Sequence, residues 1–149
     1  MLDFMVQENT KEPFGLLEDL ELKGALNDEK KMHAFCCACC RLIWDKLPDL
    51  AKEALEIAES QVNSSIDSKE IENIRVQLWN YLGSDYMKTN IPTVAATRAV
   101  ICCLYELENE SDYFSVASYT MDFCNSVENK KSEQFELLSK IFTKSHNQT

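Results

Sequence analysis

The sequence predicts an all-α fold: a single compact bundle of about six to seven helices, two of them central and apolar. Two observations predict it. Only 3 of the 149 residues are Gly and only 3 are Pro, whereas strands and their turns need these residues more often than helical bundles do. Apolar residues also recur every three or four positions along most of the chain, which is the spacing of a helix with one buried face. Hydrophobic residues make up 45% of the chain, enough to build one core at this length.

The first two helices are expected over Phe14–Leu26 and Asp28–Leu47. The first has leucines along one side and an acidic outer surface. The second has the strongest pattern, because apolar residues follow the helical spacing from Met32 to Trp44 and only His33 and Arg41 interrupt them. We therefore expect the second helix at the centre of the bundle, with Asp28 as its N-terminal cap.

Proline begins two of the later helices, where its missing N–H needs no partner. The helix that starts at Pro92 carries one charge, Arg98, between Thr93 and Tyr105, so it is expected to be the second central helix. No segment is long enough to be a linker, and residues 1–149 are predicted to form one domain with frayed ends at 1–13 and 145–149. The later helices are expected over Pro48–Val62, Ser68–Leu82, Pro92 to about Glu108, Ser111–Val127 and Lys131–Lys144.

The chain is acidic, with 25 Asp and Glu against 15 Lys and Arg and a net charge of -10. Nucleic acid and anionic membranes repel such a chain, so neither is an expected partner. The excess is uneven: residues 1–29 hold 8 acidic and 2 basic side chains, and residues 48–82 hold 7 and 3. The charge is interpreted either as a solvated surface or as a docking face for a basic protein.

No catalytic motif stands out, and the chain is predicted not to be an enzyme. We predict a non-catalytic protein-binding module, specifically a bacterial immunity or antitoxin-like protein that blocks a basic, toxin-like partner by charge complementarity. The expected contact residues lie on the first and third helices. They are Glu18, Asp19, Glu21, Glu53, Glu56 and Glu59.

Seven cysteines suggest the alternative function, a small-ligand or zinc sensor built on the two central helices. Its metal ligands would be Cys36, Cys40, Cys102 and Cys103. Adjacent cysteines on a helix point about 100° apart, however, and reduced cysteine packs well as a small apolar side chain. We therefore predict that the cysteines are core residues and that the chain carries no cofactor.

Arg41 and Arg98 are candidates for an anion-binding pocket, because each is a lone cation in an apolar helix. The alternative is a structural ion pair with a carboxylate such as Asp45 or Glu106. His33 and Cys37 are four residues apart, which permits a base and nucleophile pair, but His33 is expected to be an ordinary helix-face residue.

Aromatic residues flank the irregular stretch from Gly83 to Ile91 and are expected either to anchor a partner or to plug the end of the bundle. They include Trp79, Tyr81 and Tyr86. The N-terminal segment lacks the basic and apolar regions of a signal peptide, and no apolar run approaches the roughly 18 residues of a membrane span. A cytoplasmic location is therefore predicted.

From Lys31 to Trp44 the chain reads K-M-H-A-F-C-C-A-C-C-R-L-I-W. This segment resembles a family of uncharacterised bacterial proteins, abundant in planctomycetes, that read K-L-R-x-F-x-C-A-C-C-R-x-I-W. Ala54–Glu59 and Leu137–Phe142 resemble later segments of those proteins, whereas the middle of the chain and the residues after Phe142 do not. The resemblance implies a bacterial, cytoplasmic helical domain and carries no established activity.

Overall fold

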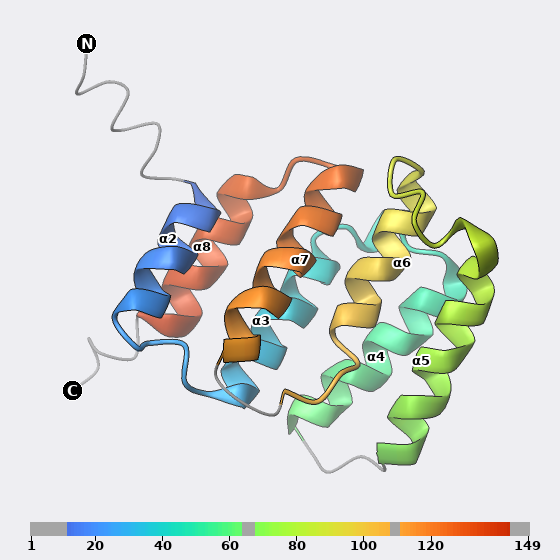
Figure 1. The fold of residues 1–149 in the computed structure, drawn as a ribbon, viewed down its shortest axis with the longest axis horizontal. Helices are drawn as coiled ribbons and strands as arrows, with labels where there is room; N and C mark the ends of the chain where they lie inside the picture. The colour runs from blue at the N-terminus through green and yellow to red at the C-terminus, as the bar shows by residue number, and fades with distance from the viewer. Residues whose placement is uncertain (1–11, 64–67, 108–110, 144–149) are drawn as a thin grey trace.

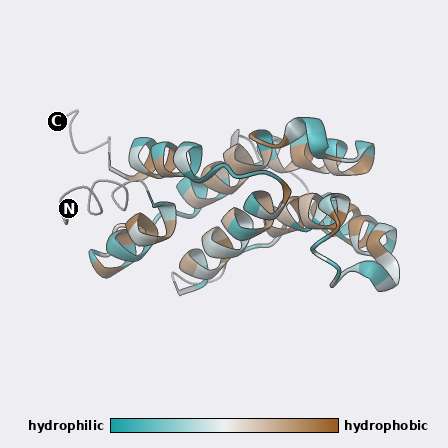
Figure 2. Cartoon of the chain, turned by 90° about the horizontal axis from the view of Figure 1, so that it is seen from above, coloured by the Kyte–Doolittle hydropathy of each residue, from teal (hydrophilic) through white to brown (hydrophobic). Residues whose placement is uncertain are grey.

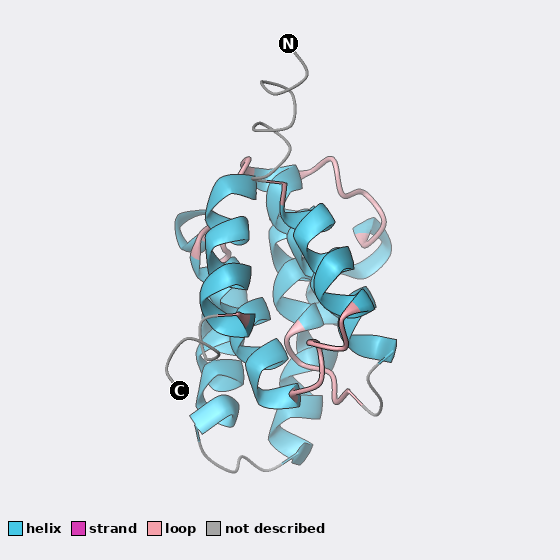
Figure 3. Cartoon of the chain, turned by 90° about the vertical axis from the view of Figure 1, so that its left-hand side faces the viewer, coloured by secondary structure: helices cyan, strands magenta, loops and turns pink. Residues whose placement is uncertain are grey.

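The computed structural model describes residues 12–63, 68–107 and 111–143. Within these ranges the protein has seven α-helices and two short 3₁₀ helices and no strand, which confirms the all-α prediction (Figure 3). The ends that were predicted to fray lie outside the described residues, apart from Glu12 and Pro13.

The helices stand side by side in pairs (Figure 1). From left to right in that view, α2 lies against α8, α7 against α3, and α6 against α4, with α5 at the right-hand end. Each helix carries both apolar and polar residues along its length (Figure 2). The helices are α2 (Pro13–Leu22), α3 (Glu29–Arg41), α4 (Asp49–Asn63), α5 (Ser68–Leu82), α6 (Pro92–Cys102), α7 (Ser111–Val127) and α8 (Lys131–Phe142).

Helix α3 is the centre of the core, as predicted, and packs against α4, α6, α7 and α8. Met32 and Phe35 are completely buried, and the Phe35 ring meets the Phe142 ring edge to face with centroids 6.3 Å apart. The helix starts at the predicted cap, because the Asp28 side chain accepts a hydrogen bond from the backbone N–H of Lys31 at 3.1 Å. Burial of this apolar surface is the main stabilising contribution to the fold.

The second helix is shorter than predicted, ending at Arg41 instead of Leu47. After Arg41 the backbone changes to 3₁₀ geometry, because the Ile43 N–H donates to the carbonyl three residues earlier. A 3₁₀ helix, η1, follows over Trp44–Lys46. Pro48 then disfavours a helical conformation at the residue before it, and Leu47 is extended with ψ 135°.

Two other helices, α2 and α6, also end several residues earlier than predicted. Helix α2 stops at Leu22 because Gly24, with φ +73°, turns the chain, and the Ala25 N–H bonds the Leu20 carbonyl at 2.9 Å. Helix α6 stops at Cys102 rather than near Glu108, because the next backbone N–H groups bond carbonyls only three residues back. Because α6 ends early, the residues after it lie outside the helix, and they form one wall of the candidate site described below.

Helix α6 is the second central helix, as predicted. Ala95, Ala96, Ala99 and Val100 are completely buried. At the end of α5, Gly83 has φ +56° and begins the second 3₁₀ helix, η2 (Gly83–Asp85).

Candidate functional site

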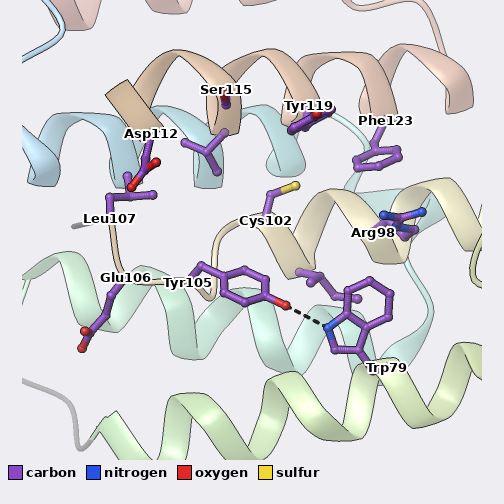
Figure 4. Close-up of a pocket in the computed structure, with 12 residues that line it drawn as sticks. Trp79, Arg98, Cys102, Tyr105, Glu106, Leu107, Asp112, Ser115, Tyr119 and Phe123 are labelled. Atoms are coloured by element: carbon purple, nitrogen blue, oxygen red, sulfur yellow. Dashed lines mark hydrogen bonds between the residues drawn. The ribbon is translucent and has the colours of Figure 1, made fainter. Parts of the chain in front are cut away.

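The candidate site is a groove of about 570 Å³ between α5, α6 and α7 (Figure 4). Its walls are mainly apolar and aromatic, and its charged groups lie at the two ends. We call this the aromatic groove. It is lined by Trp79, Arg98, Ile101, Cys102, Tyr105, Glu106, Leu107, Asp112, Ser115, Val116, Tyr119 and Phe123.

Arg98 forms the basic end of the aromatic groove. Its guanidinium carbon lies 4.8 Å from the centroid of the Phe123 ring and 5.4 Å from that of Trp79, so two rings hold it by cation–π contacts. One nitrogen donates to the Tyr86 carbonyl at 3.0 Å. None of the ion pairs among the described residues involves Arg98. The guanidinium is therefore held in place while most of its five N–H donors remain available for an anion.

A hydrogen bond joins the two walls contributed by α5 and by the turn after α6. The Trp79 indole N–H donates to the Tyr105 hydroxyl at 3.0 Å (Figure 4). Arg75 contacts the Tyr105 ring, with its guanidinium carbon 4.4 Å from the ring centroid. One of its nitrogens donates to the Leu104 carbonyl at 2.7 Å. These contacts fix the aromatic rings in position although Tyr105 itself is exposed.

Asp112 and Glu106 form the acidic end, opposite Arg98 (Figure 4). Asp112 lies in the first turn of α7, where a carboxylate is stabilised by the helix dipole. Both side chains are exposed. The aromatic groove is consequently bipolar, with a cation at one end and two carboxylates at the other.

Cys102 lines the middle of the aromatic groove and differs from the other six cysteines. It is partly exposed, whereas the other six are buried. Its surroundings still raise the pKa of the thiol to about 11, chiefly through desolvation. The Cys102 thiol is therefore protonated at neutral pH and is not a thiolate nucleophile.

The six buried cysteines lie between α3, the end of α6, and α7, and we call them the thiol cluster. They are Cys36, Cys37, Cys39, Cys40, Cys103 and Cys124. The sulfurs of Cys40 and Cys103 lie 3.7 Å apart, and the Cys124 thiol donates to the Cys39 carbonyl at 3.5 Å. Burial raises the pKa of Cys39 well above its ordinary value. These side chains pack as small apolar groups.

The cysteines proposed as alternative zinc ligands do not share a site. Cys102 lines the aromatic groove, while Cys103 contacts Cys40 in the core and Cys36 accepts from the Thr120 hydroxyl at 3.5 Å. In the part of the chain that the structure describes, no three His, Cys, Asp or Glu side chains are placed to hold a metal ion. Adjacent helical residues point in different directions, which explains why this set does not converge.

The anion pocket expected from Arg41 and Arg98 together is wrong, because the two arginines line different cavities. Arg41 is exposed and donates from Nε and Nη2 to the two carboxylate oxygens of Glu59, at 2.7 and 2.8 Å. Its guanidinium carbon also lies 4.1 Å from the centroid of the Trp44 ring. The structural ion pair expected as the alternative therefore exists for Arg41, with Glu59 as its carboxylate.

His33 is buried beside Glu29, with its Nε2 atom 3.7 Å from a Glu29 oxygen. Burial lowers the pKa of His33, and Glu29 partly opposes that effect. His33 and Cys37 line different cavities, so the structure does not bring the alternative pair of base and nucleophile into one cleft.

The six carboxylates proposed as a docking face belong to two separate helices, α2 and α4. Glu18, Asp19 and Glu21 belong to α2, at the left in Figure 1, where α2 packs against α7 and α8. Glu53, Glu56 and Glu59 belong to α4, which packs against α3, α5 and α6. The pair of α3 and α7 lies between these two helices in Figure 1, and the docking face stays a prediction. Sequence spacing places residues on one helix face but does not say which helices are neighbours.

Several groove residues could not be identified from the sequence. Asp112, Ser115 and Tyr119 come from α7, and nothing in the spacing on α7 distinguishes them from solvated surface residues. A signal did exist near α5, because Trp79 belongs to the aromatic residues predicted to anchor a partner or plug the bundle end, and it lines the groove. Tyr81 and Tyr86 from the same set remain exposed.

Comparison of the chain with protein-family models, curated proteins and solved structures found no match. The resemblance between Lys31 and Trp44 therefore stays a prediction. Among the described ranges, no helix combines the length and apolarity needed to cross a bilayer.

Proposed function

We propose that this chain is a binding protein and that its ligand site is the aromatic groove. The observation that supports this proposal is the bipolar lining: Arg98 is held at one end, Asp112 and Glu106 lie at the other, and apolar and aromatic walls lie between. Ligand sites commonly combine apolar walls with a few charged groups that orient the ligand, in volumes of about 300–1,000 Å³.

Binding is favoured over catalysis by the chemistry of the groove. The only sulfur in its lining belongs to Cys102, whose raised pKa keeps it protonated. The proposal keeps the predicted class, a non-catalytic binding module, and moves the site from the acidic helices to the aromatic groove. A basic, toxin-like partner for the carboxylates of α2 and α4 stays a prediction.

The proposal can be tested with anilinonaphthalene sulfonate (ANS), which combines aromatic rings with one anionic group. We expect saturable binding, with the sulfonate at Arg98 and the rings against Trp79 and Tyr119. Arg98→Gln should weaken binding roughly tenfold, because a charge-assisted hydrogen bond is lost. Arg41→Gln is the matched control, since it makes the same change in a different cavity and should leave ANS affinity unchanged.

Circular dichroism of each variant shows whether the fold is intact, because ANS also binds loosely packed proteins. Equal ANS affinity in the wild type, Arg98→Gln and a Tyr119→Ala variant, all folded, would contradict the assignment of the aromatic groove as the site.

A further inference from the structure

We infer that the natural occupant of the aromatic groove is the carboxyl-terminal end of a peptide chain, about four or five residues long, with a basic residue near its upstream end. The inference rests on the proposed function and names the ligand class for the same site. It is argued from the charges at the two ends, from the distance between them, and from the polar groups along the walls.

The basic end fits a carboxylate. A guanidinium group presents its N–H donors in a planar fork that matches the two oxygens of a carboxylate. The Arg98 group is held by the rings of Trp79 and Phe123 and by the Tyr86 carbonyl, so little freedom is lost when an anion binds. A polyanionic phosphate fits less well, because the chain has a net charge of -10 and two carboxylates lie in the same groove.

The acidic end fits a cation. Asp112 and Glu106 are exposed and lie on the same side of the groove (Figure 4). A lysine or arginine side chain of the ligand would reach these carboxylates while its aliphatic stem lies on Leu107 and Val116. The ligand must therefore carry opposite charges at its two ends, in the order that complements the groove.

The length of the groove favours a peptide over a single amino acid. Phe123, at the Arg98 end, and Asp112 lie eleven positions apart on α7. Eleven helical residues span about 16 Å. An extended chain advances about 3.3–3.6 Å per residue, so about four or five residues fill this length. In a free amino acid the ammonium and carboxylate groups are attached to the same carbon atom, so they cannot reach both ends of the groove.

The walls also offer groups that suit a peptide backbone. The Tyr105 hydroxyl accepts from Trp79, so its own O–H is available to donate to a carbonyl of the ligand. Ser115 and Tyr119 place two more hydroxyl groups along α7, and both side chains are exposed. Backbone N–H and C=O groups of a bound segment need such partners when water is displaced.

The inference is tested with the acetylated tetrapeptide Lys-Ala-Leu-Phe bearing a free carboxylate, measured by displacement of ANS. The first comparison peptide has a C-terminal amide, and the second has norleucine in place of lysine. For wild-type protein we expect the acid to bind at least tenfold more tightly than the amide, and the lysine peptide a few-fold more tightly than the norleucine peptide, because the latter contact is exposed.

Variants of the protein identify which side chain recognises the carboxylate of the peptide and which recognises its lysine. Arg98→Gln should abolish the preference for acid over amide and leave the preference for lysine. Asp112→Asn, and as a second variant Glu106→Gln, should reduce the lysine preference and leave the acid preference. The matched controls are Arg41→Gln and Asp49→Asn, the latter because Asp49 also lies in the first turn of a helix. Both controls should keep both preferences.

Protection of Cys102 provides a second measurement that locates the peptide. The other six cysteines are buried, so N-ethylmaleimide should modify Cys102 first in the folded protein. The acid peptide should slow this reaction at least several-fold at saturation, and the amide at the same concentration should slow it less.

The failures are distinguishable. If ANS binds in an Arg98-dependent manner but no peptide displaces it, the peptide inference is overturned and the proposed function stands. If acid and amide bind equally, the site does not read a chain terminus and the inference is overturned. If neither ANS nor any peptide responds to Arg98→Gln, both proposals fail.

Discussion

The two sides of helix α6 show how differently neighbouring residues are used. Cys103 faces the core, where it is completely buried and its sulfur lies 3.7 Å from that of Cys40. Cys102, the preceding residue, lines the aromatic groove and is partly exposed. One turn earlier, Val100 is buried in the core and Arg98 reaches into the groove. The same helix therefore supplies a wall of the thiol cluster and a wall of the candidate site.

The difference teaches that residue type alone does not define the role of a cysteine in this protein. The thiol cluster is packed and its groups are desolvated, so changes there act on the free energy of unfolding. The aromatic groove is open to solvent, so changes there act on binding and reactivity. Each of the following experiments compares the two regions, starting with the largest expected effect.

A charge introduced at Cys102, the last residue of α6, or at Cys103, the residue after it, gives the largest contrast. Cys103→Asp should lower the free energy of unfolding by several kcal/mol, about the whole stability of a typical domain, because a carboxylate would be buried without a partner. Cys102→Asp should cost no more than roughly 1–2 kcal/mol, because water reaches that side chain. Urea denaturation followed by circular dichroism measures both. Equal losses would show that Cys102 belongs to the core.

Alkylation by iodoacetamide tests the same contrast through reactivity. In the folded protein only Cys102 should react. The other six of the seven cysteines should react only after unfolding. Because the pKa of Cys102 is about 11, the thiolate fraction and hence the rate should rise roughly tenfold per unit between about pH 8 and about pH 10. Mass spectrometry identifies the modified residue. Early modification of a thiol-cluster residue would contradict the described packing.

His33 tests whether a buried polar side chain on α3 is desolvated like the apolar core around it. Burial lowers its folded-state pKa below the ordinary value of 6.5, so the unfolded chain binds more protons in that window. The free energy of unfolding should therefore fall as pH drops through 6.5 and level off below the folded-state pKa. His33→Gln should flatten this slope, as measured by urea denaturation from neutral to mildly acidic pH. An unchanged slope would place its cause in other groups.

The smallest effect is expected in the wall of the aromatic groove. Tyr105→Phe removes the acceptor for the Trp79 indole N–H, a bond exposed to water, and should cost at most about 1 kcal/mol. Thermal unfolding measures the loss, and tryptophan fluorescence reports the changed surroundings of Trp79. A loss comparable with that of Cys103→Asp would show that the groove wall is part of the core.

Much of the fold could be predicted from the sequence because helical periodicity is a local signal. The apolar spacing from Met32 onward identified the central helix, and the scarcity of charge around Arg98 identified the second one. Helix ends were less predictable where several weak effects compete. The second helix, for example, gives way to 3₁₀ geometry after Arg41 although its apolar pattern continues to Trp44.

The candidate site was much less predictable, because it exists only where three helices meet. Arg98 was identified as unusual from its apolar surroundings, but its neighbours Trp79 and Phe123 lie on other helices. Asp112 is one acidic residue among 25 Asp and Glu, and only tertiary structure places it opposite Arg98. An acidic docking face would likewise depend on how α2 and α4 are placed, which sequence spacing does not determine.

The edge-to-face contact between Phe35 and Phe142 has a consequence for synthesis on the ribosome. Helix α8 is the last of the described helices to leave the exit tunnel, and α3 needs it, together with α7, to cover its apolar surface. A nascent chain that has released α3 but not α8 exposes Phe35 and several thiols to the surrounding solution. The core therefore cannot close until α8 has been synthesised, and the apolar surface exposed before then favours aggregation.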